Sequence, residues 1–276
     1  MLLREVQYAR PRTVEEAVGL LSAHDGARPL AGGQTLVNVM KARAASPDVL
    51  VDLHDLDDLR GVRDLGNGSV EIGAMTTYSQ LVSDQAAGAR SILGEVAATI
   101  ADVQVRNRGT VGGNVCSNDP TNHLPPLFVA LDATFTIVGP GGAERTVPAD
   151  EFFVGVYMTA AGPGELLTKI TIPPGGQDGF AALTIGRDGT GIVTVAASLN
   201  GGARIAIGCV DAVPVRARQM EERIGSDFSD DNVRAAAEGL GATLDPPGDV
   251  HATAEYRRHL AEVLAARAVI AARERR

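Results

Sequence analysis

The segment RNRGTVGGNVCSND, residues 106–119, is the part of this sequence that says most about the fold. Between Gly109 and Asn114 it places three glycines, a threonine and an asparagine within six residues. Glycine loses more backbone freedom on folding than any other residue, so such a cluster indicates one of two things. Either the chain turns sharply here, or another group must come very close to the backbone.

A second glycine segment, PLAGGQTL at residues 29–36, lies about 80 residues before RGTVGGNV at residues 108–115. Each segment pairs glycines with small hydroxyl or amide side chains, among them Thr35, Thr110 and Asn114. Backbone without Cβ atoms can approach a phosphate closely and point its N–H groups at it. Two such loops suit a diphosphate held between two subdomains. Spacing alone leaves open the alternative of two tight turns without a ligand, because glycine is common in turns.

Composition and missing motifs exclude several classes of protein. A chain of 276 residues is too long for one small core and predicts two or three subdomains. Its net charge of −9 argues against a general nucleic-acid binder. With only Cys116 and Cys209, the chain alone cannot hold a four-cysteine iron–sulfur cluster. The sequence contains no Walker A loop, no strand–GxGxxG–helix unit, no HExxH and no GxSxG, and its five histidines are scattered.

The N-terminal sequence MLLREVQYARP lacks the apolar core of a secretory signal peptide. No run of about 18 apolar residues occurs anywhere, so no membrane span is predicted. These features predict a cytoplasmic protein.

The hydrophobic pattern divides the chain into three predicted units: residues 1–58, 59–174 and 175–276. In the first, a capping box at Thr13 and Glu16 predicts a helix over 13–24, with strands at 27–33 and 49–53. The second has predicted helices at 77–84, 91–102 and 124–133, strands at 69–75 and 165–173, and a hairpin around the turn at 140–143. The third begins after the linker-like segment PPGGQDG. It has a three-stranded antiparallel meander at 180–185, 191–199 and 203–210, followed by helices at 214–224, 229–240 and 253–276.

The two glycine segments resemble the flavin signatures of one family. AGGQT, residues 31–35, matches the family's AGGxS/T loop, and TVGGN, residues 110–114, matches its T-[IV]-G-G-[NDS] loop, here preceded by RNRG. DPTNHLPPLFVALDA, EFFVGVYMT, GELLTKITIP and YRRHLAEVLAARA follow in the family's order. The chain therefore resembles, over nearly its whole length, the FAD-binding medium subunit of molybdenum hydroxylases. That family includes the carbon monoxide dehydrogenase medium subunit and the flavin domain of xanthine dehydrogenase.

This resemblance implies an α+β fold. Two subdomains of the vanillyl-alcohol-oxidase/PCMH type would grip FAD, and a C-terminal α+β domain with a three-stranded antiparallel sheet would pack beside the flavin ring. It also implies an FAD-dependent oxidoreductase subunit that passes electrons from iron–sulfur clusters to an external acceptor. The implied partners are a small subunit with two [2Fe–2S] clusters and a large subunit with a molybdopterin cofactor, together a heterotrimer. Gln34 replaces the histidine of covalently flavinylated relatives, so FAD is expected to bind non-covalently.

The resemblance assigns the cofactor-binding residues to the two loops and to the segment after the second loop. Gly32 to Thr35 and Gly112 to Asn114 would cradle the diphosphate, and Asp119 and His123 would lie toward the adenosine end. Cys116 follows the second loop closely, although a buried bystander thiol is the favoured interpretation. The predicted site residues are Pro29, Leu30, Ala31, Gly32, Gly33, Gln34, Thr35, Leu36, Arg108, Gly109, Thr110, Val111, Gly112, Gly113, Asn114, Cys116, Asp119 and His123.

Two departures from the family pattern stand out. His123 occupies a position where the family usually carries Asp or Glu, although a neutral imidazole still accepts one hydrogen bond. Near Ala182, Thr190 and Gly191 the sequence lacks the lysine and the acidic residue that the family places beside the flavin ring. These departures keep two alternatives open: a stand-alone flavin-dependent oxidase or dehydrogenase on the same fold, and a scaffold that has lost FAD.

Overall fold

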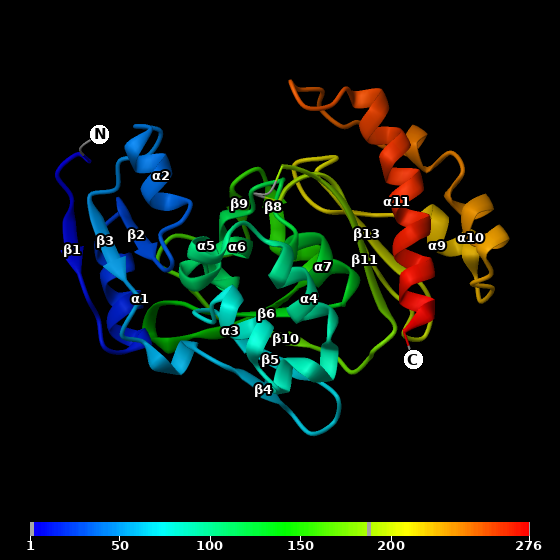
Figure 1. Cartoon of the computed structure of the whole chain (residues 1–276). Helices are drawn as coiled ribbons and strands as arrows, with labels where there is room; N and C mark the ends of the chain where they lie inside the picture. The colour runs from blue at the N-terminus through cyan, green and yellow to red at the C-terminus, as the bar shows by residue number, and fades with distance from the viewer. Residues whose placement is uncertain (1–2, 187–188, 276) are drawn as a thin grey trace.

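A computed structural model describes residues 3–186 and 189–275. Three sheets with their helices follow one another from the N-terminal to the C-terminal side of the molecule (Figure 1). The central unit separates the two others, and the helices α3 to α7 lie on one side of its sheet (Figure 1). None of the described helices combines the length and the apolar character needed to cross a membrane.

The N-terminal unit is a small parallel sheet in the order β1-β3-β2. Thr13 accepts a hydrogen bond from the Glu16 amide at the start of α1, which confirms the predicted helix start. The sequence pattern did not predict the short first strand. Because all three strands are parallel, their carboxyl ends lie at one edge, where β2 leads into the first glycine segment. The elements are β1 (Gln7–Ala9), α1 (Val14–Ala23), β2 (Ala27–Leu30), α2 (Leu36–Lys41) and β3 (Val49–Asp52).

The central unit is built on an antiparallel sheet in the order β4-β5-β10-β6-β7. Its core contains stacked aromatic rings: the centroids of Phe135 and Phe152 lie 4.0 Å apart, and Phe128 meets Phe135 edge-on. The predicted hairpin around residues 140–143 is confirmed as β6 and β7. The elements are η1 (Asp57–Leu59), β4 (Val62–Asp64), β5 (Val70–Gly73), α3 (Tyr78–Ser83), η2 (Ala86–Arg90), α4 (Ile92–Thr99), α5 (Val103–Arg108), α6 (Val111–Ser117), α7 (Leu124–Ala130), β6 (Thr134–Val138), η3 (Pro140–Gly142), β7 (Glu144–Pro148), α8 (Ala149–Phe152), β8 (Phe153–Gly155), β9 (Met158–Thr159) and β10 (Leu166–Ile172).

The C-terminal unit is an antiparallel sheet in the order β11-β12-β13-β14, with the long helix α11 packed on it (Figure 1). The sheet has one strand more than the predicted meander, because Val215 pairs with Ile207. The predicted helix over 214–224 therefore begins later, at Arg218. The elements are β11 (Asp178–Ile185), β12 (Thr190–Ser198), β13 (Arg204–Gly208), β14 (Val215–Arg216), α9 (Arg218–Ile224), α10 (Asp230–Ala237), η4 (Leu240–Thr243) and α11 (Ala254–Glu274).

A buried ion pair joins the central and C-terminal units. Arg90 at the end of η2 donates from Nε and Nη2 to the two carboxylate oxygens of Asp178, each at 2.8 Å. The two side chains are only 1% and 2% exposed, and the remaining Nη1 donates to the carbonyl oxygen of Pro173 at 2.6 Å. The segment connecting the two units is thus fixed on both sides of its glycines.

Candidate functional site

The two glycine segments meet directly. A Cβ atom built on Gly32 would lie 2.1 Å from the carbonyl oxygen of Arg108 and 2.9 Å from the Cα atom of Gly109. Only glycine permits this approach, because any side chain would push the two backbones apart. The end of β2 and the α5–α6 junction, far apart in the sequence, therefore form one continuous surface.

The first segment presents backbone N–H groups that the protein does not use. Among the described residues, no hydrogen bond has the amide of Gly32, Gly33, Gln34 or Thr35 as its donor. Gly33 has a φ of +73°, a conformation that glycine adopts without strain, and its carbonyl oxygen accepts from the amide of Val37 as α2 begins. Consecutive amides without a protein acceptor form a concave donor surface that suits an anion.

The second segment differs from the predicted loop, because residues 111–117 form helix α6. Thr110 caps this helix by accepting from the Gly113 amide at 3.0 Å. Gly112 brings the helix against β5 and its following residue: a Cβ on Gly112 would lie 2.7 Å from the Ala74 side chain. The amide of Gly112 also donates to the Ala74 carbonyl oxygen at 2.8 Å. These glycines therefore serve close packing of a helix as well as a turn.

Gly109 and Asn114 connect this segment to Tyr78. A Cβ on Gly109 would lie 2.6 Å from the Tyr78 ring, and the Tyr78 amide donates to the Gly109 carbonyl oxygen. Burial raises the pKa of the Tyr78 phenol to about 12, although a side-chain hydrogen bond with Asn114 lowers it. Asn114 is 8% exposed, and its buried Oδ1 has no hydrogen-bond partner in the protein. An unpaired buried acceptor beside the two segments marks a place for a ligand donor.

The residues after α6 lie on the side of the C-terminal unit. His123 is 3% exposed, its ring is 5.6 Å from that of Phe180, and burial lowers its pKa. Its buried Nε2 has no hydrogen-bond partner in the protein. The Asp119 carboxylate accepts from the Thr121 hydroxyl at 2.7 Å and the Tyr157 hydroxyl at 3.2 Å. Burial raises the pKa of the Cys116 thiol to about 12, which disfavours the reactive thiolate.

The surroundings of Gly191 are tightly packed. A Cβ there would lie 2.7 Å from the Cys209 sulfur and 3.1 Å from the Thr121 carbonyl oxygen, so this position has no room for a side chain. Ala182 pairs with Thr194 on β12. Its neighbours along β11, Ala181 and Leu183, pack on the C-terminal core, so Ala182 points to the opposite face of the strand. Phe180, which shares that face with Ala182, packs on the central core. Ala182 therefore faces the central unit.

A buried arginine lies behind this region, at a position that the sequence pattern does not indicate. Arg257 of α11 is 5% exposed, and its Nη1 donates to the carbonyl oxygens of Ile192 and Cys209. Its Nη2 donates to Asp249 at 2.6 Å. Cys209 has a φ of +67°, a backbone conformation that is uncommon outside glycine. Arg257 stabilises this conformation and connects the end of β13 to the start of β12. In the sequence, Arg257 is one of several arginines in the predicted helix 253–276, and nothing there distinguishes a buried arginine from an exposed one.

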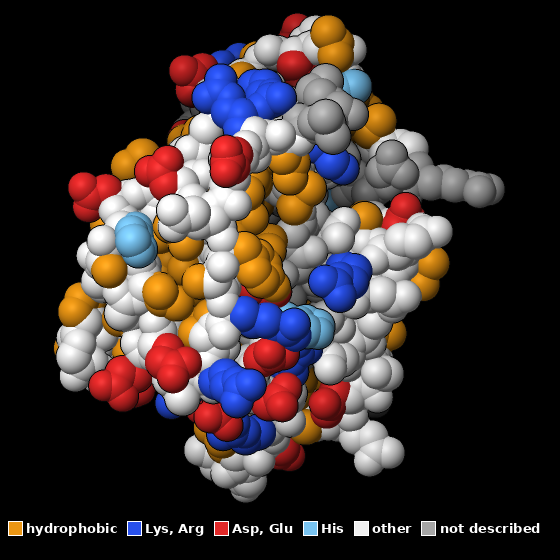
Figure 2. Space-filling model, turned by 90° about the vertical axis from the view of Figure 1, so that its left-hand side faces the viewer, with side chains coloured by type: hydrophobic (Ala, Val, Ile, Leu, Met, Phe, Trp, Pro, Cys, Tyr) orange, Lys and Arg blue, Asp and Glu red, His pale blue; other side chains and the backbone are white. Residues whose placement is uncertain are grey.

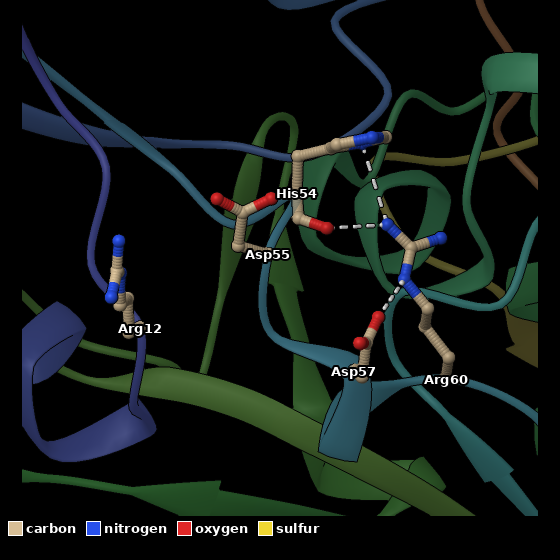
Figure 3. A pocket seen from close by; sticks show the side chains of 5 residues that line it. All are labelled: Arg12, His54, Asp55, Asp57 and Arg60. Carbon is tan, nitrogen blue, oxygen red and sulfur yellow. Dashed lines mark hydrogen bonds and ion pairs between the residues drawn. The ribbon is translucent and has the colours of Figure 1, made fainter.

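An open charged cleft of about 610 Å³ lies at the carboxyl edge of the N-terminal sheet (Figure 3). Arg60 donates to the His54 carbonyl oxygen at 2.7 Å and lies 3.4 Å from Asp57, while Arg12 approaches from the opposite side (Figure 3). Figure 2 shows charged side chains of both signs and a histidine gathered below a band of apolar side chains on this face. None of the cleft's lining residues belongs to the predicted cofactor-binding set.

The donor set fits FAD. The first segment offers unused amides, Gly32 gives the close backbone approach, and Asn114 offers an unpaired buried acceptor. The described residues contain no group of three or more His, Cys, Asp or Glu that could hold a metal ion.

Two family models match the chain. The first, described as the FAD binding domain in molybdopterin dehydrogenase, matches residues 4–175. The second, described as the CO dehydrogenase flavoprotein C-terminal domain, matches residues 189–272.

Individual relatives match over almost their full length. The carbon monoxide dehydrogenase medium chain of Afipia carboxidovorans is 39% identical over 100% of this chain and 99% of its own. The glyceraldehyde dehydrogenase medium chain of Sulfolobus acidocaldarius is 34% identical over 96% and 97%.

Solved structures agree with these matches. A carbon monoxide dehydrogenase from Hydrogenophaga pseudoflava, solved without the Mo-pyranopterin moiety, superposes with a TM-score of 0.93 at 37% identity, covering 99% of this chain and 98% of that one. Quinoline 2-oxidoreductase from Pseudomonas putida 86 gives a TM-score of 0.93 at 30% identity, covering 99% of each chain.

Proposed function

We propose, because this chain belongs to the family of FAD-binding medium subunits of molybdenum hydroxylases, that its two glycine segments hold the diphosphate of FAD between them. The chain is an FAD-binding electron-transfer subunit of a heterotrimeric oxidoreductase. It passes electrons from the iron–sulfur clusters of a small partner subunit to an external acceptor, while a large partner subunit carries the molybdopterin cofactor.

One observation carries the assignment of the residues: Gly32 lies against the backbone of Arg108 and Gly109 with no room for a Cβ. This contact brings the unused amides of residues 32–35 next to the capped start of α6. We assign Gly32, Gly33, Gln34 and Thr35 to the diphosphate as amide donors. Thr110 and Gly113 shape the facing wall, and Asn114 offers its free Oδ1 to a hydroxyl or amide of the cofactor.

The bound flavin supplies the redox chemistry, and the chain's residues bind, orient and shield it. Gln34 has a carboxamide in place of a nucleophilic imidazole, and it donates from Nε2 to the Gly32 carbonyl oxygen at 3.2 Å. Gln34 therefore shapes the loop and forms no covalent bond, which supports non-covalent FAD.

The placement of Asp119 and His123 limits their proposed roles. Both lie where the central unit meets the start of β12, and not at the contact between the glycine segments. We propose that the unpaired Nε2 of His123 and the Asp119 carboxylate contribute indirectly, by shaping the wall of the site on the C-terminal side.

We further propose that the complex resides in the cytoplasm and that the chain divides into units 1–58, 59–174 and 175–276. The three larger sheets support this division, because each of them is built from strands of one unit.

The decisive experiment is affinity purification of the tagged chain from its native host, followed by an absorption spectrum and identification of the copurifying proteins. We expect a yellow protein with about one FAD per chain, together with an iron–sulfur and a molybdopterin subunit. Acid precipitation should release the flavin into the supernatant. A colourless chain would refute FAD binding, a yellow chain without partners would favour a stand-alone flavoenzyme, and flavin in the acid pellet would refute non-covalent attachment.

A further inference from the structure

The short connection between α4 and α5 contains a strained residue. Ala101 has a φ of +48°, in the left-handed region that side chains disfavour. Asparagine and aspartate tolerate this region because their side chains can form local hydrogen bonds, but an alanine side chain cannot. The surrounding structure must therefore hold Ala101 in place. Residues strained in this way concentrate at ligand sites and switch regions.

Arg106 supplies that support. Its half-buried side chain donates from Nη1 to the Ile100 carbonyl oxygen, at 3.0 Å, and to the Ala101 carbonyl oxygen. One nitrogen thus holds two consecutive carbonyl groups of the connection. Asp102 fixes the next residue, because its side chain caps α5 by accepting from the Val105 amide at 2.8 Å. The RNRG sequence before the second glycine segment therefore begins with an arginine that holds the strained connection.

The C-terminal unit rests on the same connection. A Cβ on Gly189, in the turn between β11 and β12, would lie 2.5 Å from the Thr99 carbonyl oxygen and 3.5 Å from the Ala101 amide nitrogen. Because Gly189 has no Cβ, the backbone of this turn lies directly on the connection. Helix α4 also accepts an ion pair from the C-terminal unit, between Glu95 and Arg275 at the end of α11.

Helix α5 joins this contact to the junction of the glycine segments. The six residues of α5 span about 9 Å. The helix begins directly after the connection and ends at Arg108, whose carbonyl oxygen lies against Gly32. In Figure 1, α4 lies toward the C-terminal unit and α5 toward the N-terminal unit. A shift of the connection would therefore move α5, and the tight contact with Gly32 leaves no room for that movement.

From this arrangement we propose that Arg106 is a positioning residue for the cofactor site. It holds the α4–α5 connection in its strained conformation, and it thereby fixes α5 against Gly32 and supports the turn between β11 and β12. The inference rests on the proposed function, because the glycine segments are the site that Arg106 positions. Arg106 acts through backbone carbonyl groups and makes no contact with the cofactor itself.

Substitutions of Arg106 test this role. Because a single nitrogen makes both hydrogen bonds, a lysine ammonium can replace it, whereas a methionine side chain cannot. We expect Arg106→Met to weaken FAD binding by about tenfold and Arg106→Lys by less than about threefold, measured by fluorescence titration of the apoprotein. Arg63→Met is the matched control and should keep wild-type affinity. It removes an arginine of the same unit whose side chain is 63% exposed and pairs with Glu71.

A glycine at position 101 tests the path of the effect. Glycine adopts the left-handed region without strain, so Ala101→Gly alone should keep wild-type affinity. Combined with Arg106→Met, it should bring the FAD affinity back to within about threefold of the wild type. Direct contact between Arg106 and the cofactor would give no such recovery.

Wild-type FAD affinity in Arg106→Met would overturn the proposal, and so would a double variant that binds FAD as weakly as Arg106→Met alone. Urea unfolding of the same apoproteins separates positioning from general stability: a lower free energy of unfolding with unchanged FAD affinity would also overturn it. If Arg106→Met does not fold, the double variant decides, because it must fold and bind FAD. Failure of the proposed function looks different, since the wild-type chain itself would then bind no FAD.

Discussion

At the scale of single residues, several glycines of the site are explained by what they touch. A Cβ on Gly32 would meet the Arg108 backbone, one on Gly112 would meet Ala74, and one on Gly109 would meet the Tyr78 ring. By contrast, Gly19 in the middle of α1 has no atom within 4 Å of such a Cβ. A glycine-to-alanine substitution should therefore disturb the packing at Gly32, Gly109 or Gly112 but be tolerated at Gly19.

We predict that Gly32→Ala removes FAD binding while the chain stays folded, because the added methyl group forces the two glycine segments apart. Gly19→Ala is the matched control. It should keep full flavin content and raise the free energy of unfolding by about 1 kcal/mol, since alanine favours an exposed helix interior. Flavin content by absorption and urea unfolding by circular dichroism measure both effects. A Gly32→Ala variant with full flavin content would show that the segments tolerate separation.

At the scale of elements, helix α6 joins three features of the molecule. Its N-terminus is capped by Thr110, its first turn packs on Ala74 through Gly112, and its C-cap, Asn118, holds the β8–β9 hairpin. A shift of this one helix would therefore disturb the glycine segments and the β8–β9 hairpin together.

We predict that Thr110→Ala lowers the free energy of unfolding by about 1 kcal/mol, because the Gly113 amide loses its cap. FAD affinity should fall as well, since α6 forms one wall of the diphosphate site. Thr110→Ser keeps the hydroxyl and should restore both quantities. Denaturant unfolding of the apoprotein and fluorescence titration with FAD separate the two effects. Equal values for the Ala and Ser variants would rule out a capping role.

The sequence predicted the elements that carry a local signal. The helix start at Thr13, the hairpin at residues 140–143 and the long C-terminal helix depend on neighbouring residues, and the structure confirms them. The predicted capping box at Thr13 forms only in half, because the Glu16 carboxylate accepts from the Arg12 amide and not from the Thr13 amide. It did not predict β1 and β14, because two- or three-residue strands exist only through a distant partner such as Ile207.

Within the site, the sequence indicates both glycine segments but predicts a loop for the second, which is a helix. Gly112 and Gly113 disfavour a helix by intrinsic propensity, yet packing on Ala74 and the Thr110 cap outweigh that cost. Arg257 and the unpaired atoms of Asn114 and His123 could not be predicted, because burial is a property of the folded chain.

At the scale of the whole molecule, the position of the C-terminal unit depends on a few buried contacts with the central unit. The Arg90–Asp178 pair is almost fully enclosed, and Phe180 beside it in β11 packs on His123. A buried charge that loses its partner is costly, whereas removal of both charges is much less so.

We predict that Arg90→Ala lowers the free energy of unfolding by about 3–5 kcal/mol, because Asp178 is left buried without a partner. The double variant Arg90→Met with Asp178→Leu should recover much of this loss. Arg234→Ala is the control: its pair with Asp230 is exposed on α10 and should contribute less than about 0.5 kcal/mol. Guanidinium unfolding of all variants gives the comparison. A small effect of Arg90→Ala would mean that water reaches this junction.

The placement of β11 gives a last prediction, about the flavin's potential. Ala182 lies on the face of β11 that turns toward the central unit, and the family resemblance implies a lysine near this position. A cation there would stabilise the reduced, negatively charged flavin, and a unit-charge pair at about 4 Å is worth about 4 kcal/mol at an effective dielectric of 20. Burial of the lysine offsets much of this. Even a net 1.4 kcal/mol would raise a two-electron potential by about 30 mV.

We therefore expect Ala182→Lys to raise the flavin's midpoint potential in a spectroelectrochemical titration. The control Leu65→Lys adds the same charge in the distant β4–β5 turn and should leave the potential unchanged. An equal shift in both variants would reflect net charge alone, and an unchanged or lowered potential for Ala182→Lys would place this strand away from the flavin ring.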